Sequence, residues 1–438
     1  MSLTANLAQL TANLPGIGGV IKERPEDFLV EETPLYEPSG EGEHVYLYIE
    51  KRELPTAEVV RRLAKAFRVS RNDIGYAGLK DKHAVTRQLL SVYLPNQKHE
   101  AERLANVEMP PRLKLLWHTR HTNKLRRGHH AGNRFVIRIR RVNATAVVHA
   151  RAALKQIEQV GAPNYLGQQR FGYRDNGHHL GRHLILGRYQ DLLDELLGKP
   201  LDIETPDLRE ARRAYDEGEY DKALERCPKS LRSDRQALET LRQGKSAEQA
   251  VRAIDKAQRQ LYISAFQGAV FNRVLDRRIR ENTFDSLVAG DLAWKHDNGS
   301  VFAVDKDIAR TENAPTGRIT RLEISPSGPM WGPSMLQPQD EVLNRELLAL
   351  EEEGLGERDL QAADHLNVGG SRRPLRVFAR DIELEGGADE HGPFIKVAFT
   401  LTRGAFATMI LREVMKNDVP DASLERFKNN ASQSDNND

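Results

Sequence analysis

Alternating apolar and polar residues predict several strands in the first 142 residues of the chain. Arg134–Val142 places Phe135, Ile137 and Ile139 on one face and mostly basic residues on the other, which is the two-residue period of a strand. His44–Glu50 combines β-branched and aromatic residues, which favour strands. Further strands are predicted in Gly18–Glu32, interrupted by Pro25, and in Gln88–Leu94 and Arg112–Trp117.

Helical periodicity appears between these strands. In Thr56–Val69 apolar residues recur every three or four positions, and Thr56 is the expected N-cap. Ala144–Val160 is a second predicted helix, which Gly161 ends. Residues 1–17 carry no clear period and are expected to form a loose arm.

The pattern changes after about Leu186, where charged helical stretches dominate. They are predicted at Gln190–Leu197, Leu208–Arg226, Arg235–Gln243, Ala247–Glu281 (as two helices) and Asp340–Glu353. Short strands are expected near 292–295 and 301–304, and the Gly- and Pro-rich Ser325–Met335 is expected to be a loop. Strands return at Leu375–Glu383 and Phe394–Leu401, followed by a helix at Ala407–Lys416. These changes favour one discontinuous domain that encloses a mostly helical insertion.

Composition limits the possible functions. Among 438 residues Cys227 is the only cysteine, which excludes a disulfide framework and cysteine-based zinc or iron–sulfur sites. The chain has no apolar run of about 18 residues and no basic, apolar signal peptide at its start, so we expect a cytoplasmic protein outside the membrane. The net charge is only +2, but 111–141 holds ten Lys or Arg residues and no Asp or Glu. This run suits phosphate binding, or it forms an ordinary solvated face.

Two segments concentrate polar chemistry. In GYAGLKDKHAVTRQ, residues 75–88, Asp81 lies between two lysines, which would keep its carboxylate ionised for use as a nucleophile. The alternative is a polar turn between helix and strand. In PNYLGQQRFG, residues 163–172, Arg170 and Gln169 could bind phosphate or a base edge and Phe171 could stack, or the aromatic ring packs in the core.

Two other features carry weaker hypotheses. His179 and His183 have the spacing of two metal ligands on a helix, but no HExxH motif and no third ligand accompany them, so no metal is expected. Phe406, before an amphipathic helix, is either functional or a core aromatic. The sequence lacks a P-loop, a strand-borne GxGxxG motif, a GxSxG motif and an EF-hand loop, so no cofactor is expected.

Several long segments, in order, resemble the TruD family of tRNA pseudouridine synthases. Besides residues 75–88 and 163–172 they are IKERPEDFLVEE (21–32), NKLRRGHHAGNRF (123–135), SGPMWG (327–332), RRPLRV (372–377) and GAFATMILREV (404–414). The resemblance implies an α+β protein with a circularly permuted pseudouridine synthase fold, in which helices flank a mixed, mainly antiparallel sheet. It implies a catalytic domain in 1–186 and 369–428 and a mostly helical α+β insertion domain in 187–368. The composition of 429–438, which is almost entirely polar, predicts a disordered tail.

The same resemblance implies the activity and its residues. The chain would isomerise uridine to pseudouridine in tRNA, at position 13, without cofactor or metal, and a monomer is expected. The family's nucleophilic Asp falls on Asp81, and its substrate-contacting residues fall on Lys22, Phe28, Asn164 and Phe406. Leu166 departs from the family pattern, which often has Phe there.

Two alternatives stay open. One is a catalytically silent tRNA-binding or RNA-chaperone protein on the same scaffold, against which the intact Asp81 counts. The other is a nuclease that uses His179 and His183.

Overall fold

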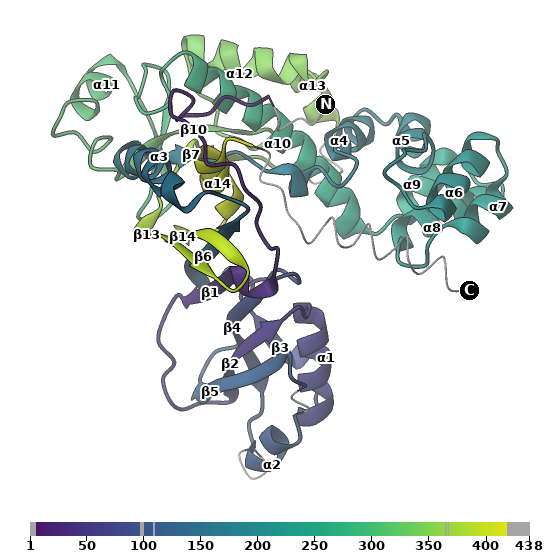
Figure 1. The fold of residues 1–438 in the computed structure, drawn as a ribbon. Coiled ribbons are helices and arrows are strands. Elements are labelled where there is room, and N and C mark those ends of the chain that lie inside the picture. Colours follow the sequence, from purple (N-terminus) through teal and green to yellow (C-terminus); the bar gives the residue numbers. More distant parts are fainter. Residues whose placement is uncertain (1–5, 97–99, 108–109, 364–365, 367, 418–438) are drawn as a thin grey trace. The chain divides into compact units, whose positions relative to one another are not determined.

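The computed structural model describes residues 6–96, 100–107, 110–363, 366 and 368–417 (Figure 1). The chain divides into two compact units. Among the described residues, the sheet unit comprises 11–162 and 377–417, and the helical unit comprises 6–10 and 163–376. The chain passes from one unit to the other between Leu10 and Thr11, within β7 (Ala162–Pro163) and within β12 (Arg376–Val377).

The sheet unit is built on a mixed sheet with the strand order β13-β14-β6-β1-β4-β2-β5, and β3 pairs with β4. The strands β1 and β4 run parallel, and the other described pairs of this sheet are antiparallel. Its strands are β1 (Phe28–Pro34), β2 (His44–Arg52), β3 (Ile74–Tyr76), β4 (Val85–Tyr93), β5 (Leu113–His121), β6 (His130–Arg140), β13 (Arg380–Asp389) and β14 (Gly392–Thr402). Its helices are α1 (Thr56–Phe67), α2 (Glu100–Ala105), α3 (Val147–Val160) and α14 (Ala407–Met415). The predicted mixed, mainly antiparallel sheet with flanking helices is confirmed.

Two apolar clusters hold helices against this sheet. Phe135, Ile137 and Ile139 of β6 are buried with apolar residues of α3 and α14, as their alternation predicts. Apolar residues of β2 and β4 pack on α1, which Figure 1 shows beside β2 and β3. Removing these apolar surfaces from water is the main force that holds the helices on the sheet.

The opposite face of β6 is less basic at the surface than its sequence suggests. Arg140 is 1% exposed. Its guanidinium binds Asp27 at 2.8 Å and Asp389 at 2.6 Å. A buried arginine needs such partners, because an unpaired charge is costly away from water.

Two local predictions in the sheet unit are wrong. Residues 11–17 do not form a loose arm, because Thr11 is buried with its hydroxyl 2.7 Å from the carboxylate of Glu413, and Ile17 N–H donates to Val414 O at 3.2 Å. Thr56 is not the N-cap of α1, since Pro55 is, and the Thr56 hydroxyl donates instead to Gln88 Oε1 at 3.0 Å.

The helical unit combines helices with a small sheet of order β11-β10-β8-β9. Its helices are α4 (Gly177–Ile185), α5 (Tyr189–Leu197), α6 (Pro206–Asp216), α7 (Tyr220–Arg226), α8 (Arg232–Arg242), α9 (Ala247–Ala253), α10 (Lys256–Arg280), α11 (Lys306–Glu312), α12 (Asp340–Glu352) and α13 (Glu357–Ala362). Its strands are β8 (Leu292–Lys295), β9 (Val301–Ala303), β10 (Ile324–Met330) and β11 (Ser371–Pro374). Gly181 lets α4 lie close to α10, because a Cβ there would collide with the carbonyl oxygen of Tyr262.

Two sequence predictions fail here as well. Ser325–Met335 is not a loop, since most of it belongs to β10, which is buried and pairs with β8 along one half and with β11 along the other. Leu208–Arg226 is two helices, α6 and α7, separated at Gly218, whose φ of +78° breaks the helix.

The units divide the chain at 10/11, 162/163 and 376/377, whereas the sequence placed the domain boundaries at 186/187 and 368/369. The assignment of 187–368 as an insertion domain stays a prediction. The tail, 429–438, lies outside the described residues. No helix within the described ranges is long and apolar enough to cross a bilayer.

Candidate active site

The segment between β3 and β4 carries Asp81, and neighbouring side chains fix its backbone. Lys51 of β2 is 1% exposed, and its Nζ donates to the carbonyl oxygen of Asp81 at 2.7 Å. The backbone N–H of Lys80 donates to the Thr56 hydroxyl at 3.2 Å. Gln88 Nε2 donates to Gly78 O at 3.4 Å. The backbone that presents Asp81 is therefore bound to β2, α1 and β4.

Lys80 does not act as the flanking cation that the sequence suggested. Its Nζ lies 2.7 Å from Glu32 Oε2 and 2.7 Å from Asn133 Oδ1, and both charged side chains are almost fully buried. Burial raises the pKa of Glu32, although the Lys80 ammonium opposes that rise. This pair connects the Asp81 segment to β1 and β6.

The carboxylate of Asp81 has two partners of its own. Its Oδ2 lies 2.5 Å from Lys22 Nζ, and its Oδ1 accepts the backbone N–H of His83 at 3.0 Å. Partial burial alone would raise the pKa of Asp81, but Lys22 and the His83 N–H together hold it below its ordinary value. With 34% of its side chain exposed, Asp81 is an ionised carboxylate that a ligand can reach.

Lys22 and Phe28 lie beside this carboxylate. Lys22 has a φ of +54°, and its Nζ stands 4.8 Å from the centroid of the Phe28 ring, within the range of a cation–π contact. Phe28 is 5% exposed and meets Phe135 edge to face at 6.3 Å. The structure thus brings together three of the five predicted site residues: Lys22, Phe28 and Asp81.

The two other predicted residues are placed differently. Phe406 is half-buried at the N-cap of α14, in the sheet unit. Asn164 belongs to the helical unit, where its Nδ2 donates to Pro374 O at 2.8 Å and its Oδ1 accepts from Arg373 at 2.5 Å. Its side chain thus supports local structure, and its predicted contact with substrate stays a prediction.

Sequence reasoning missed Lys51, although a signal was present. Val45, Leu47 and Ile49 occupy the buried positions of β2, and Lys51 continues their two-residue spacing. A lysine at an inward position of a strand needs a polar partner, and here that partner is the Asp81 backbone.

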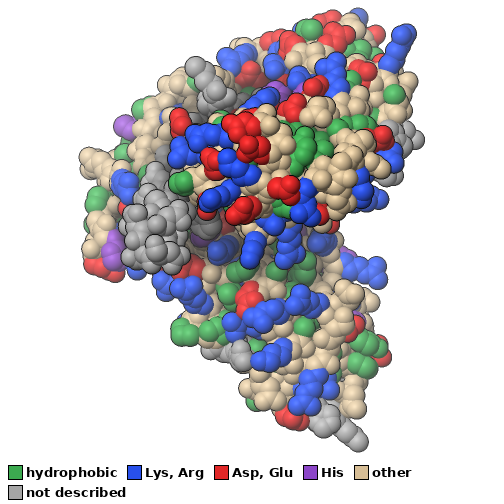
Figure 2. All heavy atoms as spheres, turned by 90° about the vertical axis from the view of Figure 1, so that its right-hand side faces the viewer, with side chains coloured by type: hydrophobic (Ala, Val, Ile, Leu, Met, Phe, Trp, Pro, Cys, Tyr) green, Lys and Arg blue, Asp and Glu red, His purple; other side chains and the backbone are tan. Residues whose placement is uncertain are grey.

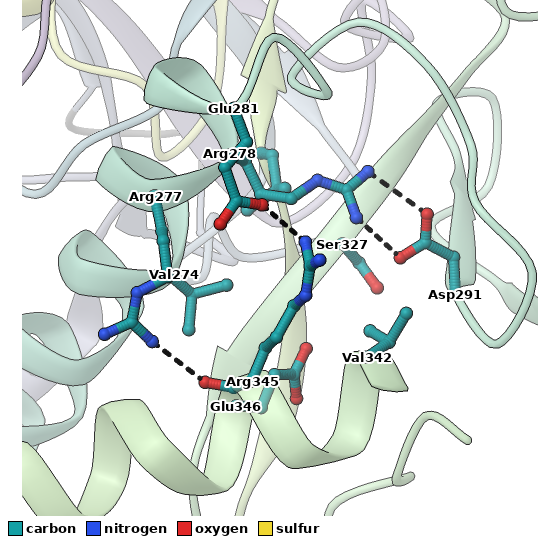
Figure 3. A pocket seen from close by; sticks show the side chains of 10 residues that line it. Val274, Arg277, Arg278, Glu281, Asp291, Ser327, Val342, Arg345 and Glu346 are labelled. Carbon is teal, nitrogen blue, oxygen red and sulfur yellow. Dashed lines mark hydrogen bonds and ion pairs between the residues drawn. The ribbon is translucent and has the colours of Figure 1, made fainter. Parts of the chain in front are cut away.

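The predicted histidine pair and one pocket of the helical unit bear on metal and phosphate binding. Within the described ranges, no cluster of three His, Cys, Asp or Glu side chains could hold a metal ion, and His179 and His183 lie on α4. Figure 3 shows a small pocket in this unit where arginines and carboxylates neutralise one another. In it Arg278 binds Asp291 at 3.0 and 3.1 Å, and Arg345 binds Glu281. These pairs leave little net charge for a phosphate.

Comparison with known proteins gives a consistent result. Residues 4–414 match the family model described as tRNA pseudouridine synthase D (TruD). The chain is 43% identical to tRNA pseudouridine synthase D of Geotalea daltonii, over 93% of this chain and 99% of that protein. It is also 43% identical to that of Geobacter metallireducens, over 94% and 98%.

A solved structure supports the fold. The crystal structure of the putative tRNA pseudouridine synthase D from Methanosarcina mazei has a TM-score of 0.78 with this chain. The two are 23% identical, and the match covers 95% of this chain and 98% of that one. The predicted fold class is therefore confirmed.

Proposed function

Because the chain belongs to the tRNA pseudouridine synthase D family, we propose that it isomerises uridine to pseudouridine at position 13 of tRNA, with Asp81 as the reacting carboxylate. The observation that carries the choice of Asp81 is its ion pair with Lys22, at 2.5 Å, beside the ring of Phe28. This pair keeps the carboxylate charged while a third of its side chain stays accessible.

The reaction exchanges one bond to the ribose for another. The bond between N1 of the base and C1′ breaks, the uracil turns, and C5 then bonds to C1′. The hydrogen leaves C5 and N1 ends protonated, so atoms and electrons balance without an oxidant, a metal or a cofactor. An ionised Asp81 serves either as the nucleophile at the sugar or as the base that starts elimination.

The surroundings of Asp81 suit both routes. A uridine inside folded tRNA must leave its stack to reach the carboxylate. Lys51 holds the backbone of Asp81, and Lys22 orients its side chain, so the oxygen atoms are fixed before substrate arrives. We assign Phe28 and Phe406, in the same unit as Asp81, to contacts with the displaced base, and Asn164 of the helical unit stays a predicted substrate contact.

The test uses an unmodified tRNA transcript with uridine at position 13, incubated with the protein and a chelator. Pseudouridine is mapped by position, and tRNA binding is measured separately. Wild type should form product there, whereas Asp81→Asn should bind tRNA equally and form none. Asp381→Asn makes the same chemical change at an exposed Asp of the same unit and should behave as wild type.

Other results would point elsewhere. Equal tRNA binding with no product from either protein would favour the silent RNA-binding alternative. Product from Asp81→Asn would refute the role of this carboxylate. Activity lost in chelator would favour the nuclease that uses His179 and His183.

A further inference from the structure

A basic surface lies beside the Asp81 segment, and two distant parts of the chain build it. We call it the cation rim: Lys124, Arg126, Arg127 and Arg403. Gly128 connects the rim to the segment that precedes Asp81 and to Arg403. The backbone N–H of Gly128 donates to Ala77 O at 2.8 Å, and the carbonyl of Gly128 accepts from Arg403 Nη1 at 3.0 Å. Arg403 is 275 residues from Gly128 along the chain, so no sequence motif reveals this neighbour.

The Gly128 turn and the Asp81 segment share further contacts. Arg127 lies over the ring of Tyr76, with 6.0 Å between its Cζ and the ring centroid. Lys124 donates to the carbonyl of Asn72, just before β3. A Cβ at Gly78 would lie 3.7 Å from His130. The rim is therefore fixed to the segment that runs from β3 to Asp81.

The rim residues differ from other cations of the basic run in their ion pairs. Five of the ten cations in 111–141 form ion pairs with carboxylates: Arg120, Arg134, Arg138, Arg140 and Arg141. In the part of the chain that the structure describes, no Asp or Glu pairs with any of the four rim residues. Arg126, Arg127 and Arg403 are exposed.

A neighbouring histidine is consistent with this positive potential. Burial, together with the charges of Lys80 and Arg403, lowers the pKa of His130 to about 4. On the face drawn in Figure 2, Lys and Arg side chains are more prominent than Asp and Glu side chains over the lower part.

We propose that the cation rim binds the phosphates of the tRNA strand next to the nucleotide that reaches Asp81. The proposal rests on the proposed function, because it takes the tRNA as the ligand. Exposed arginines without carboxylate partners favour phosphates, to which their planar guanidinium groups donate two hydrogen bonds at once. Phosphate contacts fix the register of a nucleic acid without reading its sequence. The rim would thus position tRNA while the Asp81 site performs the chemistry.

The experiment replaces Arg126, Arg127 and Arg403 by Gln, singly and together. The dissociation constant for tRNA is measured between 50 and about 300 mM salt, and kcat and KM are measured at one salt concentration. Each lost phosphate contact should reduce the slope of log affinity against log salt by about 0.7 to 0.9. The triple variant should therefore lose about 2 to 3 units of slope and bind at least tenfold more weakly, with kcat within about twofold of wild type.

Two controls keep the result specific. Arg151→Gln removes an exposed arginine of α3 for which the structure records no carboxylate ion pair, and its slope should equal that of wild type. Arg403→Lys keeps the charge and should retain the slope. Circular dichroism verifies that each variant is folded.

The outcomes separate the two proposals. An unchanged slope and KM in the folded triple variant would overturn the cation rim. The proposal would also be overturned if polyglutamate competed with tRNA as strongly as polyuridine of the same charge does. Such competition would indicate an acidic protein surface as the ligand of the rim. If wild type makes no pseudouridine yet the triple variant still loses tRNA affinity and slope, the rim stands and the proposed function fails.

Discussion

Lys51 offers a sharp test of how the fold prepares Asp81. Its side chain is buried, and its ammonium donates to the backbone carbonyls of Asp81, at 2.7 Å, and of Lys80, at 3.5 Å. Neither of these two hydrogen bonds of Lys51 reaches the side-chain carboxylate of Asp81. Lys51→Met keeps the length and apolar stem of the side chain and removes its charge and donors. The variant therefore changes the support of Asp81 and leaves its chemistry in place.

The expected effect on stability is small because two contributions oppose each other. Burial lowers the pKa of Lys51 from 10.5 to about 8, although Asp81 opposes that change. That difference corresponds to about 3 kcal/mol of destabilisation of the charged form, which Met relieves. Losing the donor leaves a buried carbonyl unsatisfied, at a cost of about 1–3 kcal/mol. The free energy of unfolding should therefore change by no more than about 2 kcal/mol.

Activity should respond much more strongly. A displacement of about 1 Å in a catalytic group can reduce a rate about 100-fold. We expect kcat for Lys51→Met to fall at least tenfold, with KM for tRNA within about twofold. Single-turnover kinetics measures the chemical step, and urea unfolding measures stability. Lys155→Met, at an exposed position of α3, is the matched control and should match wild type in both.

The pH dependence of stability gives an independent check. Between about pH 8 and 10.5, Lys51 is protonated in the unfolded chain and has lost its proton in the folded protein. Because the unfolded state then binds more protons, Lys51 makes the free energy of unfolding increase with pH in this window. Lys80 and Asp81 are the charged neighbours of this group. Lys51→Met should lack that rise. A folded Lys51→Met protein with wild-type kcat would refute the positioning role.

Three further predictions concern other charged groups. Lys22→Met should raise the pKa of Asp81, so the acid limb of the kcat profile should move to higher pH; an unmoved limb would contradict the pairing. His130 has a folded pKa of about 4 against 6.5 ordinarily, so its contribution to stability should be lost as pH falls from 6.5 to 4, and His130→Asn should flatten urea-unfolding data in that window. Glu346→Ala leaves Arg372 buried without its carboxylate and should destabilise the helical unit by about 3–5 kcal/mol, visible in thermal unfolding, whereas Glu351→Ala, at an exposed position of the same helix, should not.

Periodicity predicted most of the elements because local pattern and tertiary packing agree in them. In β6 the apolar positions 135, 137 and 139 are all buried. The prediction failed at β10, where Pro326 and Pro329 suggested a loop. Proline has no backbone N–H to donate to a neighbouring strand. The strand β10 still forms, because it pairs with β8 along its first half and with β11 along its second half, and does not need the N–H groups that Pro326 and Pro329 lack. Pairing between distant segments decided this structure, and local composition could not show it.

The site shows the same division between local and distant information. The Asp81 motif is contiguous, and the sequence identified it as a candidate carboxylate. Its supports are not contiguous, because Lys22 and Lys51 come from separate segments and reach Asp81 only in the fold. Lys80, which the sequence treated as a cation for Asp81, pairs with Glu32 instead. Flanking residues are thus a poor guide to the electrostatics of a site, because side chains that follow one another along an extended segment point in different directions.

The distribution of ion pairs explains how a chain of net charge +2 can offer a positive surface to a polyanion. Arg140, in the basic run, is neutralised by Asp27 and Asp389, which lie far from it in sequence and are at most partly exposed. Arg126 and Arg127, in the same run, have no such carboxylate in the described structure, and folding adds Arg403 beside them. Counting charges therefore underestimates the potential next to Asp81, because many of the carboxylates that balance the total act elsewhere in the fold. Phosphate binding should depend on these few residues and hardly at all on the paired arginines.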